Sequence, residues 1–176
     1  SGANSSSIVV SPATNTVYTV SGNLSGCPVT ATNTSSVSVE TTPTISASNG
    51  SICLGQTYTI APSGASTYTY SSGSNTVAPV TTSSYSVSGT GTNGCVSASV
   101  TLTVTVNNLP TVSVSGGSIC AGQVYTITPS GASTYTYSGG SNTVSPVASG
   151  IYSVSGTNTA GCVSASAATL QLTVYN

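Results

Sequence analysis

The chain contains a long internal repeat. From Ser51 it reads SICLGQTYTIAPSGASTYTYSSGSNTVAPV, and from Ser118 it returns as SICAGQVYTITPSGASTYTYSGGSNTVSPV. The interval from Ser51 to Ser118 matches one small domain, so the chain is expected to fold as a series of similar units. A fold proposed for one unit must therefore also fit the sequence of the next unit.

Residue 1 does not coincide with the first residue of a repeat. The segment from Ser7, SIVVSPATNTVYTVSG, matches the second half of a repeat, around SNTVAPVTTSSYSVSG. We therefore predict that residues 1–42 form the C-terminal half of a repeat whose first half is missing or supplied elsewhere. Residues 43–109 and 110–176 are predicted to be two whole repeats. The links between units, TTP and NNLP, are short and contain proline, which predicts a stiff rod.

Apolar residues in the repeat alternate with polar ones. This period of two indicates strands with one buried face, and clusters of Gly, Ser, Asn and Pro separate the strands. The pattern predicts an all-β fold of tandem small antiparallel β-sandwich domains in a linear array, with six or seven short strands per repeat. The inward positions of the first whole repeat are Tyr58, Ile60, Tyr68, Tyr70, Tyr85, Val87, Val100, Leu102, Val104 and Val106.

The chemistry available to the chain is narrow. It contains no Lys, Arg, His or Asp, and Glu40 is its only acidic side chain. Catalytic triads, paired carboxylates and Schiff-base lysines cannot be assembled from these residues, nor can carboxylate-rich metal sites or a basic face for nucleic acid. We predict no enzymatic activity, no catalytic, cofactor-binding or metal site, and no nucleic-acid partner.

No membrane or targeting segment is expected either. No apolar run approaches the ~20 residues that span a bilayer. The opening residues, SGANSSS, lack the basic and apolar regions of a signal peptide, so we expect a mature or excised segment without membrane insertion.

The five cysteines recur with the repeat. Cys53 precedes Cys95 by the same interval that separates Cys120 from Cys162. Because a domain of this size has a marginal core, we predict one disulfide within each whole repeat, Cys53–Cys95 and Cys120–Cys162, and hence an oxidising extracellular compartment. Cys27 corresponds to Cys95 and has no mate within its unit. Its partner is either an upstream half-repeat, which we favour, or another chain.

A family resemblance is carried by the segments SICLGQTYTIAPSGASTYTYSSGS, SSYSVSGTGTNGCVSASVTLTVTV and NNLP. Together they resemble the tandem immunoglobulin-like or PKD-like repeats of bacterial secreted and surface proteins, particularly large adhesins and matrix proteins. Those repeats commonly carry Trp where this chain has Tyr70 and Tyr137. The resemblance covers essentially the whole chain and implies a structural or adhesive role outside the cell or at its surface, without catalytic residues.

Three other motifs have competing interpretations. Gly89, Gly91 and Gly94 spell the G-x-G-x-x-G of dinucleotide-binding loops, but a strand pattern follows them where that motif needs a helix, which favours a turn. Cys53 and Gln56 have the spacing of an internal thioester, which the recurring disulfide mates disfavour. The tyrosines could form a sugar-stacking platform, although their inward positions favour core packing.

The surface is rich in acceptors for sugar, with 37 Ser and 31 Thr in the chain. The N-x-Ser/Thr triplets fall at Asn4, Asn23, Asn33 and Asn49. We predict covalent glycans, with O-linked sugars on outward Ser and Thr favoured over N-linked ones, because an almost uncharged β-protein lacks the repulsion that prevents association.

Two classes of function remain. The first is a structural extracellular fibre or stalk of disulfide-bonded, glycosylated repeats, whose partners are copies of itself or neighbouring repeats. Such a protein would resist trypsin, which finds no Lys or Arg to cleave after. The second is an adhesin or carbohydrate-binding module of a cell-surface protein. Loops repeated almost unchanged, such as PSGAS, favour the first class, because binding loops more often diversify.

Overall fold

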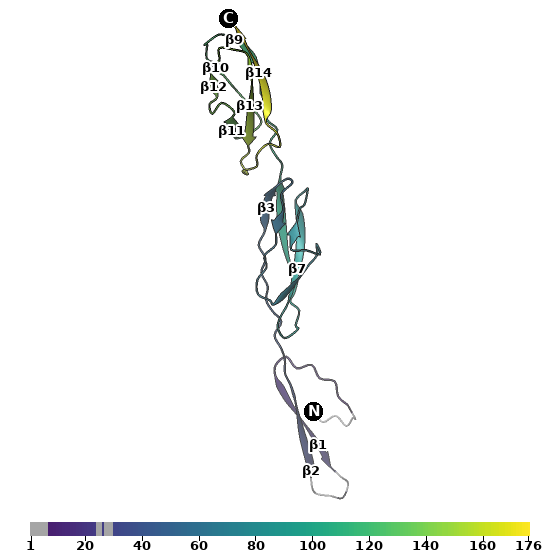
Figure 1. Cartoon of the computed structure of the whole chain (residues 1–176). Coiled ribbons are helices and arrows are strands. Elements are labelled where there is room, and N and C mark those ends of the chain that lie inside the picture. The colour runs from purple at the N-terminus through teal and green to yellow at the C-terminus, as the bar shows by residue number, and fades with distance from the viewer. Residues whose placement is uncertain (1–6, 24–25, 27–29) are drawn as a thin grey trace.

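The computed structural model describes residues 7–23, 26 and 30–176. Within these residues the regular structure is entirely β, which confirms the predicted fold class. Figure 1 shows a hairpin followed by two separate β-sandwiches, placed one after another along a line from the N-terminal to the C-terminal end. The described residues include no helical segment that could span a lipid bilayer.

The strands are short, and the two sandwiches contain them in matching order. The hairpin is formed by β1 (Thr16–Asn23) and β2 (Thr30–Val37). The strands of the first sandwich are β3 (Gly50–Cys53), β4 (Tyr58–Thr59), β5 (Thr67–Tyr70), β6 (Thr76–Val77), β7 (Ser83–Thr90) and β8 (Val100–Asn107). The strands of the second sandwich are β9 (Gly117–Cys120), β10 (Tyr125–Thr126), β11 (Thr134–Tyr137), β12 (Thr143–Val144), β13 (Gly150–Thr157) and β14 (Ala168–Tyr175).

Each sandwich pairs a four-stranded sheet with a two-stranded one. In the first sandwich the larger sheet has the order β3-β8-β7-β5 and the smaller sheet is β4-β6. All pairs are antiparallel except β3 with β8, which run parallel with Cys53 opposite Asn107. The second sandwich repeats this arrangement with β9-β14-β13-β11 and β10-β12. Because β3 runs parallel to β8, the last strand of the sandwich, β3 finishes on the side from which the chain continues to the next repeat.

The core lies between the two sheets of each sandwich. Alternation along β7 and β8 turns every second side chain inward, which is why Val87, Leu102 and Val104 are buried there. Complete burial of such a side chain stabilises a fold by about 1.5–3 kcal/mol. The buried core of the first sandwich is Ile45, Ile52, Ile60, Val77, Val87, Leu102 and Val104, and that of the second includes Ile127, Val154, Leu170 and Leu172.

The tyrosines pack beside these cores, as predicted. Tyr58, Tyr68, Tyr70 and Tyr85 are half-buried against the first core. The hydroxyl of Tyr68 accepts a hydrogen bond from the backbone N–H of Ala65 (3.0 Å) and donates to the carbonyl of the same residue (3.1 Å). Tyr68 therefore packs beside the core and also closes the PSGAS turn.

The hairpin β1-β2 differs from both sandwiches. Its two strands pair only with each other among the described residues. Almost all of its residues are exposed, including Val17 and Val20. The predicted limits of the three units, at 42/43 and 109/110, stay predictions, although the strands of each sandwich fall inside them.

Candidate functional site: the junction between the sandwiches

A disulfide joins the two sandwiches. Cys53, the last residue of β3, is bonded to Cys162, which lies 109 residues further along the chain in the loop after β13. The two Cα atoms are 5.6 Å apart, as such a bond requires. The predicted pairings within each repeat, Cys53–Cys95 and Cys120–Cys162, are therefore wrong.

The reason lies in the length of the sandwich. Cys53 is opposite Asn107 at one end of β8, whereas Cys95 follows β7 at the end where β8 begins with Val100. At about 3.3 Å per residue, β8 alone separates these ends by roughly 23 Å. Bonded cysteines need Cα atoms within about 4.4–6.8 Å of each other. Two cysteines at opposite ends of one sandwich can instead each reach a neighbouring repeat.

An asparagine holds the cysteine loop against the incoming link. The side chain of Asn158 accepts hydrogen bonds from the backbone N–H of Ala160 (3.0 Å) and Cys162 (2.9 Å), and donates from Nδ2 to the carbonyl of Asn108 (2.8 Å). The bonded Cys162 is only 1% exposed. The polypeptide link, this amide and the disulfide thus meet at the same junction.

The same arrangement exists at the other end of the first sandwich. Asn93 accepts from the backbone N–H of Cys95 (3.1 Å) and donates to the carbonyl of Thr41 (3.0 Å). Thr41 is the counterpart of Asn108 in the preceding repeat, so both amides bind the same point of an incoming link. Cys95 therefore occupies the place of Cys162 relative to the preceding segment.

Two cysteines of the described chain are not disulfide-bonded, Cys95 and Cys120. Cys120 ends β9 as Cys53 ends β3, and it is exposed at the C-terminal end of the second sandwich. Cys27 lies outside the described residues, so both of its predicted partners stay predictions. Each whole repeat therefore presents one bonded and one unbonded cysteine, at opposite ends.

The structure also settles two of the competing motif interpretations. Gly91 and Gly94 form a turn closed by a backbone hydrogen bond of 3.0 Å after β7, so the glycine motif opens no helix. The side chain of Gln56 accepts from the backbone N–H of Cys53 (3.0 Å), whose sulfur is already in the disulfide. The disulfide excludes a thioester between these two residues.

Three of the four predicted N-glycosylation residues are described, and all three are exposed. Asn23 ends β1 and Asn33 lies within β2. Asn49 directly precedes β3, and its side-chain oxygen accepts from the backbone N–H of Thr103 (2.8 Å). Asn4 lies outside the described residues. Glycan attachment at any of them stays a prediction, as does the expected absence of cofactors and metals.

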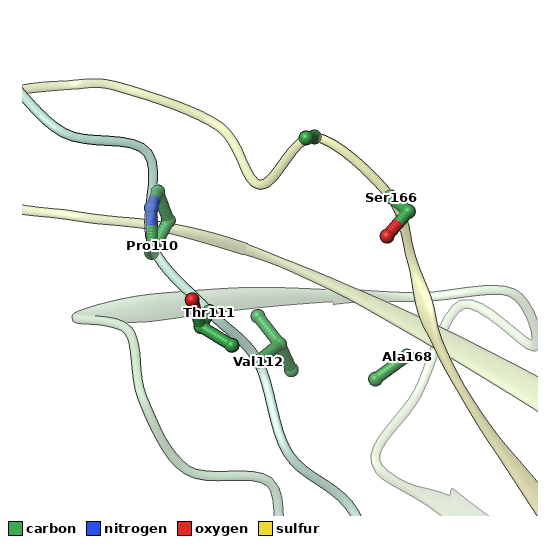
Figure 2. Close-up of a pocket in the computed structure, with 6 residues that line it drawn as sticks. Pro110, Thr111, Val112, Ser166 and Ala168 are labelled. Atoms are coloured by element: carbon green, nitrogen blue, oxygen red, sulfur yellow. The ribbon is translucent and has the colours of Figure 1, made fainter. Parts of the chain in front are cut away.

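A small open pocket lies at the entry to the second sandwich, and Figure 2 shows residues of the incoming link and of the loop before β14 that line it. Its volume is about 150 Å³, below the roughly 300 Å³ of typical ligand sites. Val112 stands where the first sandwich has the larger Ile45, and one extra residue separates Cys162 from Leu170 compared with Cys95 and Leu102. Imperfect filling of a repeated core thus accounts for the pocket.

Comparisons with known proteins identify no family for this chain. No protein-family model and no curated protein matches it. Among solved structures, fibronectin(III)-like modules of Clostridium thermocellum CbhA match over 74% of this chain and 94% of theirs, with 12% identity and a TM-score of 0.40. Extracellular domains 3–5 of Drosophila OTK match over 92% of this chain and 72% of theirs, with 13% identity and a TM-score of 0.31.

Sequence reasoning missed the two junction asparagines. The interval from Asn93 to Asn158 is shorter than the repeat. An alignment of the repeats at a fixed offset therefore does not match these two residues, although their side chains make equivalent hydrogen bonds. A signal was nevertheless present, since each precedes its cysteine within the turn sequences TNGC and TNTAGC. Asparagine is favoured where a side-chain oxygen must accept from backbone N–H groups in a turn.

Proposed function

We propose that this chain is a structural extracellular element, a stalk or fibre in which consecutive immunoglobulin-like repeats are bonded to one another by disulfides. The observation that carries this proposal is the Cys53–Cys162 bond. A small domain that only needed stabilising would bond its own sheets together. A bond across the junction instead fixes one repeat on the next, which is useful when the array must transmit tension or resist bending.

Several other features support this proposal. The junction is also held by the hydrogen bond from Asn158 to Asn108, and the link itself contains Pro110. The bonded cysteines imply an oxidising compartment outside the cytosol. The exposed end of β9 carries Cys120 at the place equivalent to Cys53, where a following repeat could be bonded in the same way.

The finer assignments belong to the same proposal. We place the protein among secreted or surface adhesin and matrix repeats of the bacterial PKD-like kind, with covalent glycans on outward hydroxyls, resistance to trypsin and no enzymatic activity. An adhesin or carbohydrate-binding module is the competing assignment. It predicts that the repeats themselves, and not only a terminal domain, retain a glycan or matrix ligand.

The test is electron microscopy of the native assembly at a resolution that shows single sandwiches. Continuous rods of stacked sandwiches, with density beyond Ser, Thr or Asn side chains, would support a glycosylated fibre. Separate chains that retain glycan in a pull-down through these repeats would contradict it and support the adhesin.

A measurement under force tests the mechanical part of the proposal. When both ends of the oxidised chain are pulled, the 109-residue separation between Cys53 and Cys162 cannot extend. Reduction should therefore lengthen the fully unfolded chain by roughly 360–390 Å, at about 3.3–3.6 Å per residue. An equal length before and after reduction would show that the bond does not limit the extension of the array.

A further inference from the structure

The hairpin β1-β2 is built like the central pair of strands in a complete sandwich. It pairs Thr16 with Val37, and β7-β8 pairs their repeat counterparts, Ser83 and Val104, in the same register. A side chain just before the first strand also fastens the second strand in the same way. Asn15 accepts from the backbone N–H of Val39 (2.7 Å), as Thr82 accepts from that of Val106 (3.1 Å).

Among the residues that the structure describes, no further strand covers the pair β1-β2. In the complete sheet, β3 pairs with the outer edge of β8 and β5 with the outer edge of β7. Val87 is then 1% exposed, whereas its hairpin counterpart Val20 is 64% exposed. Likewise Val77 of β6 is 7% exposed and its counterpart Val10 is 37% exposed. Open strand edges with exposed valines are a surface for another strand to pair with.

The second, independent observation is Cys95. It faces the hairpin unit in the setting that Cys162 has at the next junction, with Asn93 in the role of Asn158. At that next junction the bonded partner is the cysteine that ends β3. A strand like β3, placed beside β2, would bring an equivalent cysteine to the end of the hairpin unit that faces Cys95.

We propose that the hairpin β1-β2 is the docking site for a segment of the same sequence type as residues 43–73, and that the cysteine of this segment forms a disulfide with Cys95. The segment would add a parallel strand beside β2 and an antiparallel strand beside β1. In both whole repeats the corresponding residues directly precede the counterpart of Ser7, so the occupant is a further segment of this repeat type.

The covalent step is an ordinary dithiol oxidation. The thiol of Cys95 and the thiol of the docked segment lose two protons and two electrons and form one S–S bond. The electrons pass to the disulfide of a thiol oxidant, such as oxidised glutathione, which is reduced to two thiols. The two cysteines are brought together by strand pairing, so the bond forms after docking.

This unit should depend on its disulfide more than the others do. On the face of the hairpin that carries Val20, Asn33 and Ser35 stand at the counterparts of Val100 and Leu102, which makes this core more polar. Glu40 replaces Asn107, whose Nδ2 donates to Ser51 Oγ (2.7 Å) and to the carbonyl of Ile52 (3.2 Å). A carboxylate can accept from the serine but cannot donate to the carbonyl.

The test adds such a segment to the chain. In one variant a second copy of residues 43–73 replaces residues 1–6, directly before Ser7; in its matched control the cysteine of the inserted copy is serine. After oxidation by glutathione, peptide mapping without reduction should find the inserted cysteine bonded to Cys95. Amide exchange in β1 and β2 should slow about tenfold or more relative to the original chain, because their edges become paired.

Alternative outcomes overturn the proposal. A bond from the inserted cysteine to Cys27 would establish pairing within one repeat instead. Unchanged amide exchange in β1 and β2, in both the variant and its serine control, would show that the hairpin does not accept this segment.

A single-residue comparison needs no cysteine chemistry. In the original chain, Val20→Ala should leave thermal unfolding unchanged, since the side chain is exposed. In the serine control with the inserted segment, the same substitution should lower the midpoint of unfolding, and Val87→Ala should do the same in the complete sandwich. An equal response of the two chains to Val20→Ala would contradict docking over this face.

Discussion

The two complete sandwiches differ in their cysteines far more than in their strands. Both have six strands in the same order and a parallel strand that ends in cysteine. Yet the first sandwich uses that cysteine, Cys53, in a disulfide, whereas the second uses its loop cysteine, Cys162. The bond joins unlike surfaces of consecutive repeats, so the contact is heterologous and can propagate along an array without closing.

The largest effect is expected from breaking the junction bond. C162S should lower the free energy of unfolding by up to about 4–5 kcal/mol, the chain-entropy estimate for a loop of this length. Thermal unfolding measured by calorimetry should also become two separate transitions, because each sandwich keeps its own core. The matched control is C120S, which removes an unbonded cysteine from the same sandwich and should leave the profile unchanged. Equal profiles for the two variants would refute a bond that couples the sandwiches.

A second pair of variants tests whether the cores are equivalent. Leu102 and Leu170 are counterparts buried to 1% and 3% exposure. Leu102→Ala and Leu170→Ala should each cost about 2–5 kcal/mol, through lost burial and the cavity that remains. Denaturant unfolding of the reduced protein measures each cost. If one substitution were tolerated, the two sandwiches would not share the packing described above.

A third pair addresses the PSGAS turns. Gly64 and Gly131 have φ of +98° and +96°, and a Cβ on either would overlap the carbonyl of Thr44 or Thr111. Gly64→Ala and Gly131→Ala should each destabilise by about 1–3 kcal/mol. Ala at Gly73, which has a positive φ but no neighbour within 4 Å, is the control for conformational strain alone. A cost as large at Gly73 would show that the overlap contributes nothing.

The cysteine pairing shows where sequence reasoning reached its limit. The alternation of Tyr85 and Val87 was sufficient to predict the strands, because burial of one face fixes which residues alternate. Spacing alone could not predict which cysteines are bonded, since the four cysteines of the two whole repeats can be paired in three ways. The deciding fact is that β3 runs parallel to β8, which takes Cys53 to the far end of its sandwich. Such long-range strand pairing leaves no local trace in the sequence.

The smallest expected effect concerns the pocket that distinguishes the second sandwich. Val112→Ile should fill part of it and stabilise the chain by about 0.5–1.5 kcal/mol, the usual difference between buried Val and Ile. The reciprocal change, Ile45→Val, should destabilise the first sandwich by a similar amount. Calorimetry of both variants provides the measurement. If the pocket were already closed in solution, Val112→Ile would not stabilise the chain, and the two substitutions would no longer change stability in opposite directions.

The junction disulfide also makes a closed ring of the chain between its two cysteines. Cys53 and Cys162 enclose the whole link from Asn107 to Pro110 and most of both sandwiches. A protease that cuts once anywhere inside this ring opens a loop but does not divide the molecule. An array of repeats bonded in this way would stay covalently continuous after a single cut at any one junction.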